Sequence, residues 1–105
     1  MSGRKPAVRL TGNAGRDVAT ILFHTRRTWG EERRAAYRAS IFSAFDHLRD
    51  HPHIGLRRDD LLPGCRSLPV EQHVIYYHLS ETSSDELEVL RVLHARQNPE
   101  HAFRD

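Results

Sequence analysis

The spacing of apolar residues along the chain predicts a strand, two helices and then further strands. Residues 7–11 alternate, with Val8 and Leu10 on one side and Arg9 on the other, which predicts a short first strand. Apolar side chains then recur at helical spacing over residues 13–29 and 31–50. The first stripe consists of Val18, Ile21, Leu22 and Trp29, and the second of Tyr37, Ile41, Ala44, Phe45 and Leu48. Both stripes predict amphipathic helices.

Local signals indicate where these helices begin and end. Asn13 can cap the first helix, and Gly30 is suited to end it as a C-cap glycine. Two glutamates follow Gly30 and favour the start of the second helix. That helix must stop near Asp50, because the next residue precedes Pro52. With one glycine between them, the helices are expected to form an αα-hairpin.

The second half of the chain predicts three strands joined by polar links. The strands are expected at residues 66–70, 73–79 and 87–95. Residues 52–64 and 80–85 are predicted to be loops. Pro69 lacks a backbone donor, which indicates an edge strand or a bulge at that point. The short links favour an antiparallel meander.

This order of elements predicts a single α+β domain over residues 1–105. The order is β-α-α-β-β-β, with the helical hairpin packed on one face of a curved, mostly antiparallel sheet. A chain of 105 residues is long enough to bury one core without disulfides.

Composition favours a cytoplasmic protein with a mildly basic surface. Cys65 is the only cysteine, and no apolar run approaches the roughly 20 residues of a membrane span. The formal net charge is +2, and Lys5 is the only lysine among sixteen Lys and Arg residues. Solvated faces explain most of this arginine, although a mildly basic chain also suits an acidic partner.

The segment 88–100 begins as a buried strand and ends as a cationic tail. Arg91 interrupts its apolar part, so it must find a partner in the sheet or face a groove. Strand alternation predicts that Arg91 and His94 point to opposite faces. His94 and Arg96 lie where the strand leaves the sheet, a frequent place for functional side chains.

Several local motifs, taken in order, resemble the ParE branch of the RelE/ParE toxins of bacterial toxin–antitoxin pairs. They extend over nearly the whole chain and lie at residues 29–32, 51–55, 63–70, 74–77 and 89–99. In the last segment, Arg91, His94, Arg96 and Gln97 have the spacing that this family uses. The glycine-rich segment 12–15 departs from the family, which often has a more helix-friendly start there.

The resemblance implies a binding toxin rather than an enzyme, with no cofactor. Such a toxin is held inactive by a ParD-like antitoxin encoded beside it, and it poisons DNA gyrase and blocks replication. Contact with DNA is expected only through the antitoxin complex, and no membrane partner is expected.

Two further hypotheses remain open. The sister branch, like RelE, cleaves messenger RNA on the ribosome, which here would use His94 as base and Arg91 and Arg96 to hold phosphate. That branch tends to carry a tyrosine just past the last strand, where this chain has only Phe103. The other hypothesis is a degenerate member that retains antitoxin binding without toxicity.

The eight histidines do not predict a metal site. His47, His51 and His53 form the closest group, and the first two have the i,i+4 spacing that can place two imidazoles on one helix face. The helix is expected to end beside His51, however, so we expect no metal.

Two phenylalanines lie off the helical stripes, which indicates an apolar surface open to a partner. At about 100° per residue, Phe23 lies about 140° from Val18, and Phe42 about 140° from Tyr37. A broad buried face is the alternative explanation. The resemblance implies that an antitoxin helix docks in an apolar groove here. We expect the antitoxin site to include Phe23, Trp29, Tyr37 and Phe42, and the target site to include His94, Arg96, Gln97 and Phe103. Arg91 is expected to brace the sheet.

Overall fold

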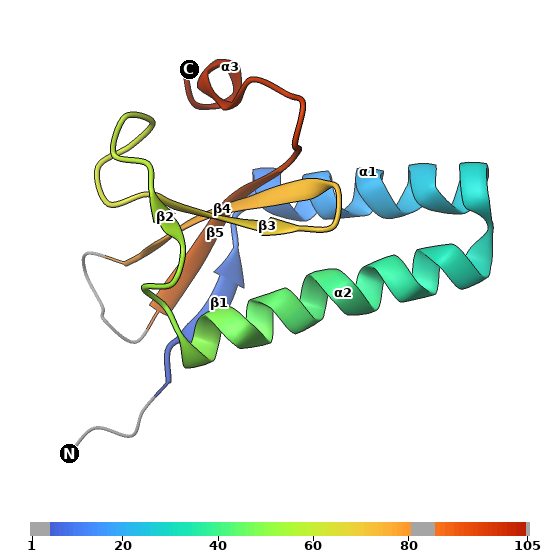
Figure 1. The fold of residues 1–105 in the computed structure, drawn as a ribbon, viewed down its shortest axis with the longest axis horizontal. Helices are drawn as coiled ribbons and strands as arrows, with labels where there is room; N and C mark the ends of the chain where they lie inside the picture. The colour runs from blue at the N-terminus through green and yellow to red at the C-terminus, as the bar shows by residue number, and fades with distance from the viewer. Residues whose placement is uncertain (1–4, 81–85, 105) are drawn as a thin grey trace.

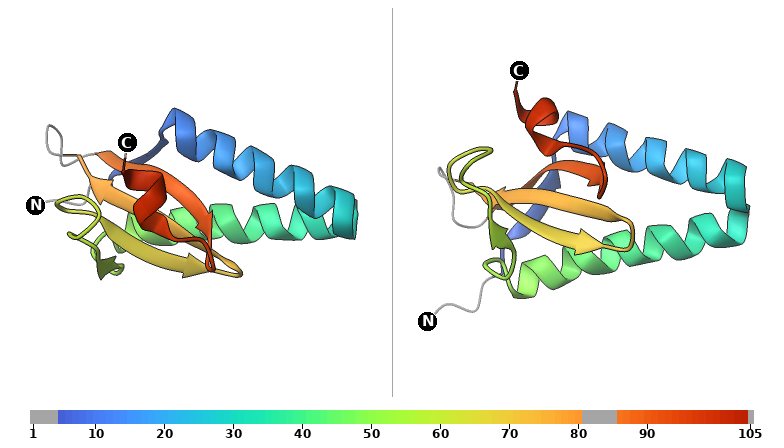
Figure 2. Two further views of the ribbon diagram at one scale, coloured as in Figure 1. Left: turned by 90° about the horizontal axis from the view of Figure 1, so that it is seen from above. Right: turned by 45° about the horizontal axis from the view of Figure 1, so that its top comes forward.

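A helical hairpin covers one face of a five-stranded sheet. The computed structural model describes residues 5–80 and 86–104. Its elements are β1 (Ala7–Leu10), α1 (Gly12–Trp29), α2 (Glu31–Asp50), β2 (Leu56–Arg57), β3 (Arg66–Val70), β4 (His73–Leu79), β5 (Glu86–His94) and α3 (Pro99–Phe103). The joined ends of α1 and α2 project well beyond the sheet (Figures 1 and 2). The predicted α+β architecture is therefore confirmed.

The strand order in the sheet is β1-β5-β4-β3-β2. The strands β3, β4 and β5 form the expected antiparallel meander, β2 adds an unpredicted antiparallel strand beside β3, and β1 pairs in parallel with β5 over residues 86–89. Beyond Val89, the outer edge of β5 therefore has no strand beside it. Most of the polar loop predicted at 80–85 lies outside the described residues.

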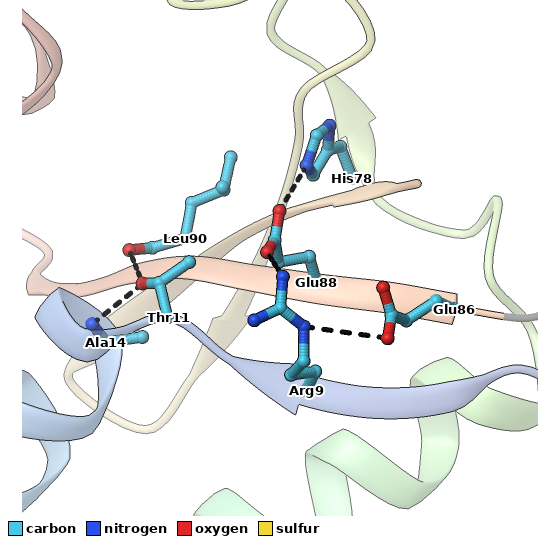
Figure 3. A network of polar contacts seen from close by, with 7 residues as sticks. All are labelled: Arg9, Thr11, Ala14, His78, Glu86, Glu88 and Leu90. Atoms are coloured by element: carbon cyan, nitrogen blue, oxygen red, sulfur yellow. Dashed lines mark hydrogen bonds and ion pairs between the residues drawn. The ribbon is translucent and has the colours of Figure 1, made fainter. Parts of the chain in front are cut away.

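Thr11, and not Asn13, caps α1. The Thr11 Oγ1 accepts a hydrogen bond from the Ala14 amide at 3.1 Å and donates one to the Leu90 carbonyl at 3.0 Å (Figure 3). The prediction of Asn13 as the cap is wrong because the helix begins directly after β1, and Asn13 instead accepts from Arg16 within the first turn. Thr11 thus joins the end of β1, the start of α1 and β5.

The region predicted as the loop 52–64 contains the short strand β2. Leu56 pairs with Ser67 and Arg57 with Arg66. Two residues are too few to show an alternation, which is why the pattern of apolar positions missed this strand. Because β2 is so short, Pro69 lies on an open edge of β3, which agrees with the predicted edge position.

The irregularity in the sheet lies between β4 and β5. Tyr76 pairs with Arg91 and Tyr77 with Val89, so Leu90 has no partner on β4. Tyr77 is fully buried, and its hydroxyl donates to the Pro52 carbonyl and accepts from the Gly55 amide, both at 2.9 Å. These bonds hold the start of the 52–64 segment against the sheet.

The sheet is covered on both faces. The main core lies between the hairpin and the sheet, and includes Val18, Ile41, Phe45, Leu48, Ile75, Tyr77, Leu87, Val89 and Val92. A smaller cluster of Cys65, Tyr76 and Leu93 packs against Phe103 of α3. This last helix, which lies against the sheet and apart from the hairpin (Figure 2), was not predicted.

A polar row crosses β1, β5 and β4. Arg9 pairs with Glu86 and Glu88, and Glu88 also contacts His78, at 2.9 Å (Figure 3). Charged and polar neighbours on adjacent strands stabilise the pairing of those strands. The parallel strand β1 is thereby held by side chains as well as by its backbone.

Candidate partner-binding site

A groove of about 460 Å³ lies between α1 and the end of β5. One face of α1 forms its first wall, from Asp17 through His24 to Trp29. The second wall comes from the end of β5 and the tail, including His94 and Gln97. The groove exists because α1 continues past the end of β1, and among the described residues no strand lies beside the outer edge of β5 there.

The base of this groove is an ion pair between Asp17 and Arg91. The Arg91 Nε and Nη2 donate to the two Asp17 carboxylate oxygens at 2.7 and 2.9 Å. The backbone amide of Val92 also donates to Asp17, at 2.9 Å. The hydrogen bond that Arg91 donates to Asp17 is the main cause that raises the pKa of Arg91. Arg91 therefore braces the sheet against α1, as expected.

Arg91 and His94 both line this groove, although they alternate along β5. Arg91 pairs with Tyr76 of the cluster under α3, and His94 with His73, which contacts Tyr37 of the hairpin, so the register agrees with the predicted opposite faces. Arg91 lies at the outer edge of β5, and its long side chain reaches over that edge to α1.

Tyr37 connects α2 to the start of β4 beside the groove. Its hydroxyl lies 2.5 Å from the His73 Nδ1 and accepts a hydrogen bond from the Gln72 amide at 3.1 Å. The rings of His73 and His94 meet edge to face, with centroids 5.3 Å apart. Burial, with a smaller effect from His94, lowers the pKa of His73, and burial raises the pKa of Tyr37.

The four residues expected to bind the antitoxin lie in different surroundings. Trp29 is 68% exposed and lines the groove. Phe23 is 56% exposed and contacts Arg27. Phe42 is 37% exposed and lines a separate cavity of about 420 Å³ between α2 and β1. Tyr37 is half-buried and contributes to the packing of the hairpin on the sheet.

The residues expected to bind the target fall into two places. His94 and Gln97 line the groove, and exposed Arg96 lies beside them, with its amide donating to the His94 Nδ1 at 3.1 Å. Phe103 lies elsewhere, half-buried, with its ring centroid 5.6 Å from that of Tyr76. Its contact holds α3 on the sheet.

The arginine considered for catalysis is bound to another side chain, and the histidines considered for metal binding lack a further ligand nearby. Arg91 is bound by Asp17, which occupies the guanidinium that the nuclease hypothesis requires for phosphate. The His47 and His51 rings lie 4.9 Å apart, and within the described part of the chain no three metal-ligating side chains come together. Burial raises the pKa of the Cys65 thiol to about 11, which disfavours the reactive thiolate. None of the described helices is long and apolar enough to cross a membrane.

The chain matches a known protein family over most of its length. The family described as "ParE toxin of type II toxin-antitoxin system, parDE" matches residues 8–99. The chain belongs to this family of ParE toxins. It is 28% identical over 90 residues to Toxin ParE1 of Caulobacter vibrioides, an alignment that covers 86% of this chain and 90% of the relative.

A solved structure supports the fold of this ParE toxin. A chain of the chromosomal ParDE TA system from P. aeruginosa superposes with a TM-score of 0.71 at 21% identity. The match covers 86% of this chain and 96% of the other. This structure confirms the fold, and the family match over residues 8–99 confirms the predicted membership of the ParE branch.

Two residues that line the groove of this ParE toxin, Asp17 and His73, were not predicted from the sequence. Asp17 shares a helix face with the polar residues His24 and Thr28, and this spacing was a usable signal. His73 lies at the start of the predicted strand 73–79 and carries no local signal of a site. Its contacts depend on residues distant in sequence, Tyr37 and His94, which no local pattern reveals.

Proposed function

We propose that this ParE toxin acts by binding DNA gyrase, traps it on broken DNA, and is neutralised by a ParD-like antitoxin in the cytoplasm. The observation that carries the proposal is the groove between α1 and the end of β5, where exposed Trp29 lies with His94 and Gln97. Aromatic side chains exposed beside hydrogen-bonding groups are typical of protein-binding sites.

The surroundings of Arg91 favour binding over catalysis. RNA cleavage would need a cation free to stabilise the phosphate, whereas the Nε and Nη2 of this guanidinium donate to Asp17, which also neutralises its charge. We therefore assign His94, Arg96 and Gln97 to target binding, with Phe103 supporting the tail through α3. Phe23, Trp29, Tyr37 and Phe42 are assigned to the antitoxin, Tyr37 mainly by holding the hairpin in place.

A pair of parallel assays tests the proposal. Purified toxin is added to a gyrase supercoiling and cleavage reaction, and to a translation reaction that is analysed by primer extension. Accumulation of cleaved plasmid, prevented by the antitoxin, is the expected result. Cuts in messenger RNA at ribosomal A-site codons, with gyrase unaffected, would instead identify an endonuclease. No effect in either assay would identify a non-toxic member of the family.

A further inference from the structure

Three exposed aromatic rings of the helical hairpin each carry an arginine guanidinium. The pairs are Phe23–Arg27, Trp29–Arg33 and Phe42–Arg38, with the guanidinium carbon 5.7, 5.6 and 4.5 Å from the ring centre. Within α1 and α2 a separation of four residues places side chains next to each other, and the Trp29–Arg33 pair spans the turn at Gly30. A guanidinium held over a ring loses part of its rotational freedom and keeps its N–H groups available for hydrogen bonds. We refer to Arg27, Arg33 and Arg38 as the hairpin arginines.

Among the described residues, the hairpin arginines have no hydrogen-bond acceptor. All three are exposed, and their contacts are to the rings beside them. Most other arginines of the described chain are different, and those that pair with carboxylates are Arg9, Arg26, Arg34, Arg57, Arg58 and Arg91. The N–H groups of the hairpin arginines are therefore open to an acceptor from another molecule.

The end of the hairpin that carries Arg27 and Arg33 is strongly basic. Residues 26–38 contain five arginines and two glutamates, a formal charge of +3, whereas the whole chain carries +2. The remaining residues are therefore slightly acidic as a group. The joined ends of α1 and α2 also project beyond the sheet, so a large partner can approach them (Figures 1 and 2). Concentrated positive charge on a projecting element attracts a partner with dense negative charge.

The open position of the hairpin arginines favours a nucleic acid over a compact anion or a peptide. None of the described cavities is lined by a hairpin arginine, and a cavity is what encloses a nucleotide or the apolar side chains of a peptide. A nucleic-acid backbone instead presents closely spaced phosphates to exposed side chains. The planar guanidinium binds phosphate with two parallel hydrogen bonds, and the neighbouring rings offer faces on which bases can stack.

We propose that the hairpin arginines bind the phosphate backbone of DNA directly, as a second contact of this toxin beside its protein target. The sequence predicted contact with DNA only through the antitoxin complex, whereas this contact belongs to the toxin alone. The inference rests on the proposed function for the source of the DNA, which is the broken duplex held by gyrase. The contacts of the arginines themselves need no gyrase.

Binding of a short, fluorescently labelled DNA duplex of arbitrary sequence tests the inference, with anisotropy measured at several salt concentrations. The toxin is used without antitoxin, because the rings beside the hairpin arginines are assigned to antitoxin binding. For three phosphate contacts, the logarithm of the association constant should fall with the logarithm of the salt concentration with a slope of about −2.7. Arg27→Gln/Arg33→Gln removes two of these contacts, so the slope should change to about −1 and the Kd should rise about tenfold or more at low salt.

Arg57→Gln/Arg104→Gln is the matched control for the loss of two positive charges. Both arginines are exposed, and they lie on β2 and directly after α3, away from the joined ends of the hairpin (Figure 1). This variant should keep the wild-type slope and bind DNA within about twofold of wild type, because salt screens charges that lie beyond about 10 Å. Thermal unfolding first establishes that both variants fold.

The outcomes separate this inference from the proposed function. Absence of DNA binding by wild-type toxin, or equal weakening in the two double variants, would overturn the inference. If gyrase is trapped although toxin alone does not bind DNA, the proposed function stands and the direct contact is refuted. If the DNA measurements give the expected slopes while gyrase is unaffected in the cleavage reaction, the hairpin arginines remain a DNA-binding surface and the proposed target is refuted.

Discussion

Asp17 and Arg91 lie 74 residues apart in the sequence and join through two hydrogen bonds of 2.7 and 2.9 Å. Their side chains are only 15% and 23% exposed, so the pair is shielded from much of the solvent. The same carboxylate accepts the Val92 amide at the point where β1 no longer covers the edge of β5. This one residue therefore replaces a missing strand neighbour and fixes α1 to the end of the sheet.

Asp17→Ala should destabilise the fold. It leaves the Arg91 guanidinium and the Val92 amide without their acceptor, so we expect a loss of about 2–3 kcal/mol, less than the 3–5 kcal/mol of fully buried pairs. The free energy of unfolding is measured by urea denaturation. Asp59→Ala, which removes a carboxylate from an exposed pair with Arg57, is the control and should change stability little. Equal effects of the two variants would refute the structural role of Asp17.

The Asp17–Arg91 pair also marks the limit of what the sequence predicts. Helix ends at Trp29 and Asp50 were predictable because Gly30 and Pro52 act on their immediate neighbours. The partner of Arg91 was not, because a contact across 74 residues leaves no periodic signal. The last helix had a usable signal, since Asn98 precedes Pro99 and caps it by accepting the Glu100 amide. Its short length hid it from any count of helical spacing.

The two glycines at positions 55 and 15 should respond to alanine in opposite directions. A Cβ at Gly55 would lie 2.7 Å from the Tyr77 hydroxyl and 2.8 Å from the Ser67 carbonyl. Since Tyr77 is fully buried and cannot move freely, Gly55→Ala should cost about 1–3 kcal/mol. Gly15 lies in α1 with nothing within 4 Å of such a Cβ, so Gly15→Ala should stabilise by about 0.5–1 kcal/mol. Thermal and urea unfolding of both variants measure the difference, and a neutral Gly55→Ala would show that the 52–55 segment is not held against Tyr77.

His73 should make the stability of the fold depend on pH. Its pKa is lowered in the folded state by burial and by His94, so the folded state favours the neutral imidazole that accepts from Tyr37. The contribution is complete above the unfolded pKa of about 6.5. As the pH falls below that value, the unfolded chain takes up the proton first, and stability decreases until the lowered folded pKa is reached.

The variant His73→Gln isolates this effect. It retains a side-chain acceptor for Tyr37 and cannot titrate, so its stability should fall less than that of wild type between pH 7 and pH 5. Urea unfolding at several pH values gives the two curves, and carboxylates that titrate in the same acid range contribute equally to both. Parallel curves would show that burial of His73 is not linked to folding.

Phe23 and Phe42 should contribute to antitoxin binding separately. Phe23 lies on the exposed side of α1, whereas Phe42 lines the cavity beside β1, and no described cavity contains both. Each change to serine should weaken antitoxin binding, and the double variant should show the product of the two fold-changes, because distant sites act independently.

Phe42→Ser should also cost some stability, since its ring packs against buried Phe45 with centroids 5.3 Å apart. Phe23 is 56% exposed, and its ring contacts exposed His24 and Arg27, so Phe23→Ser should leave folding unchanged. Calorimetric titration and thermal unfolding of the three variants distinguish the two effects, and unchanged affinity of the double variant would remove both residues from the antitoxin site.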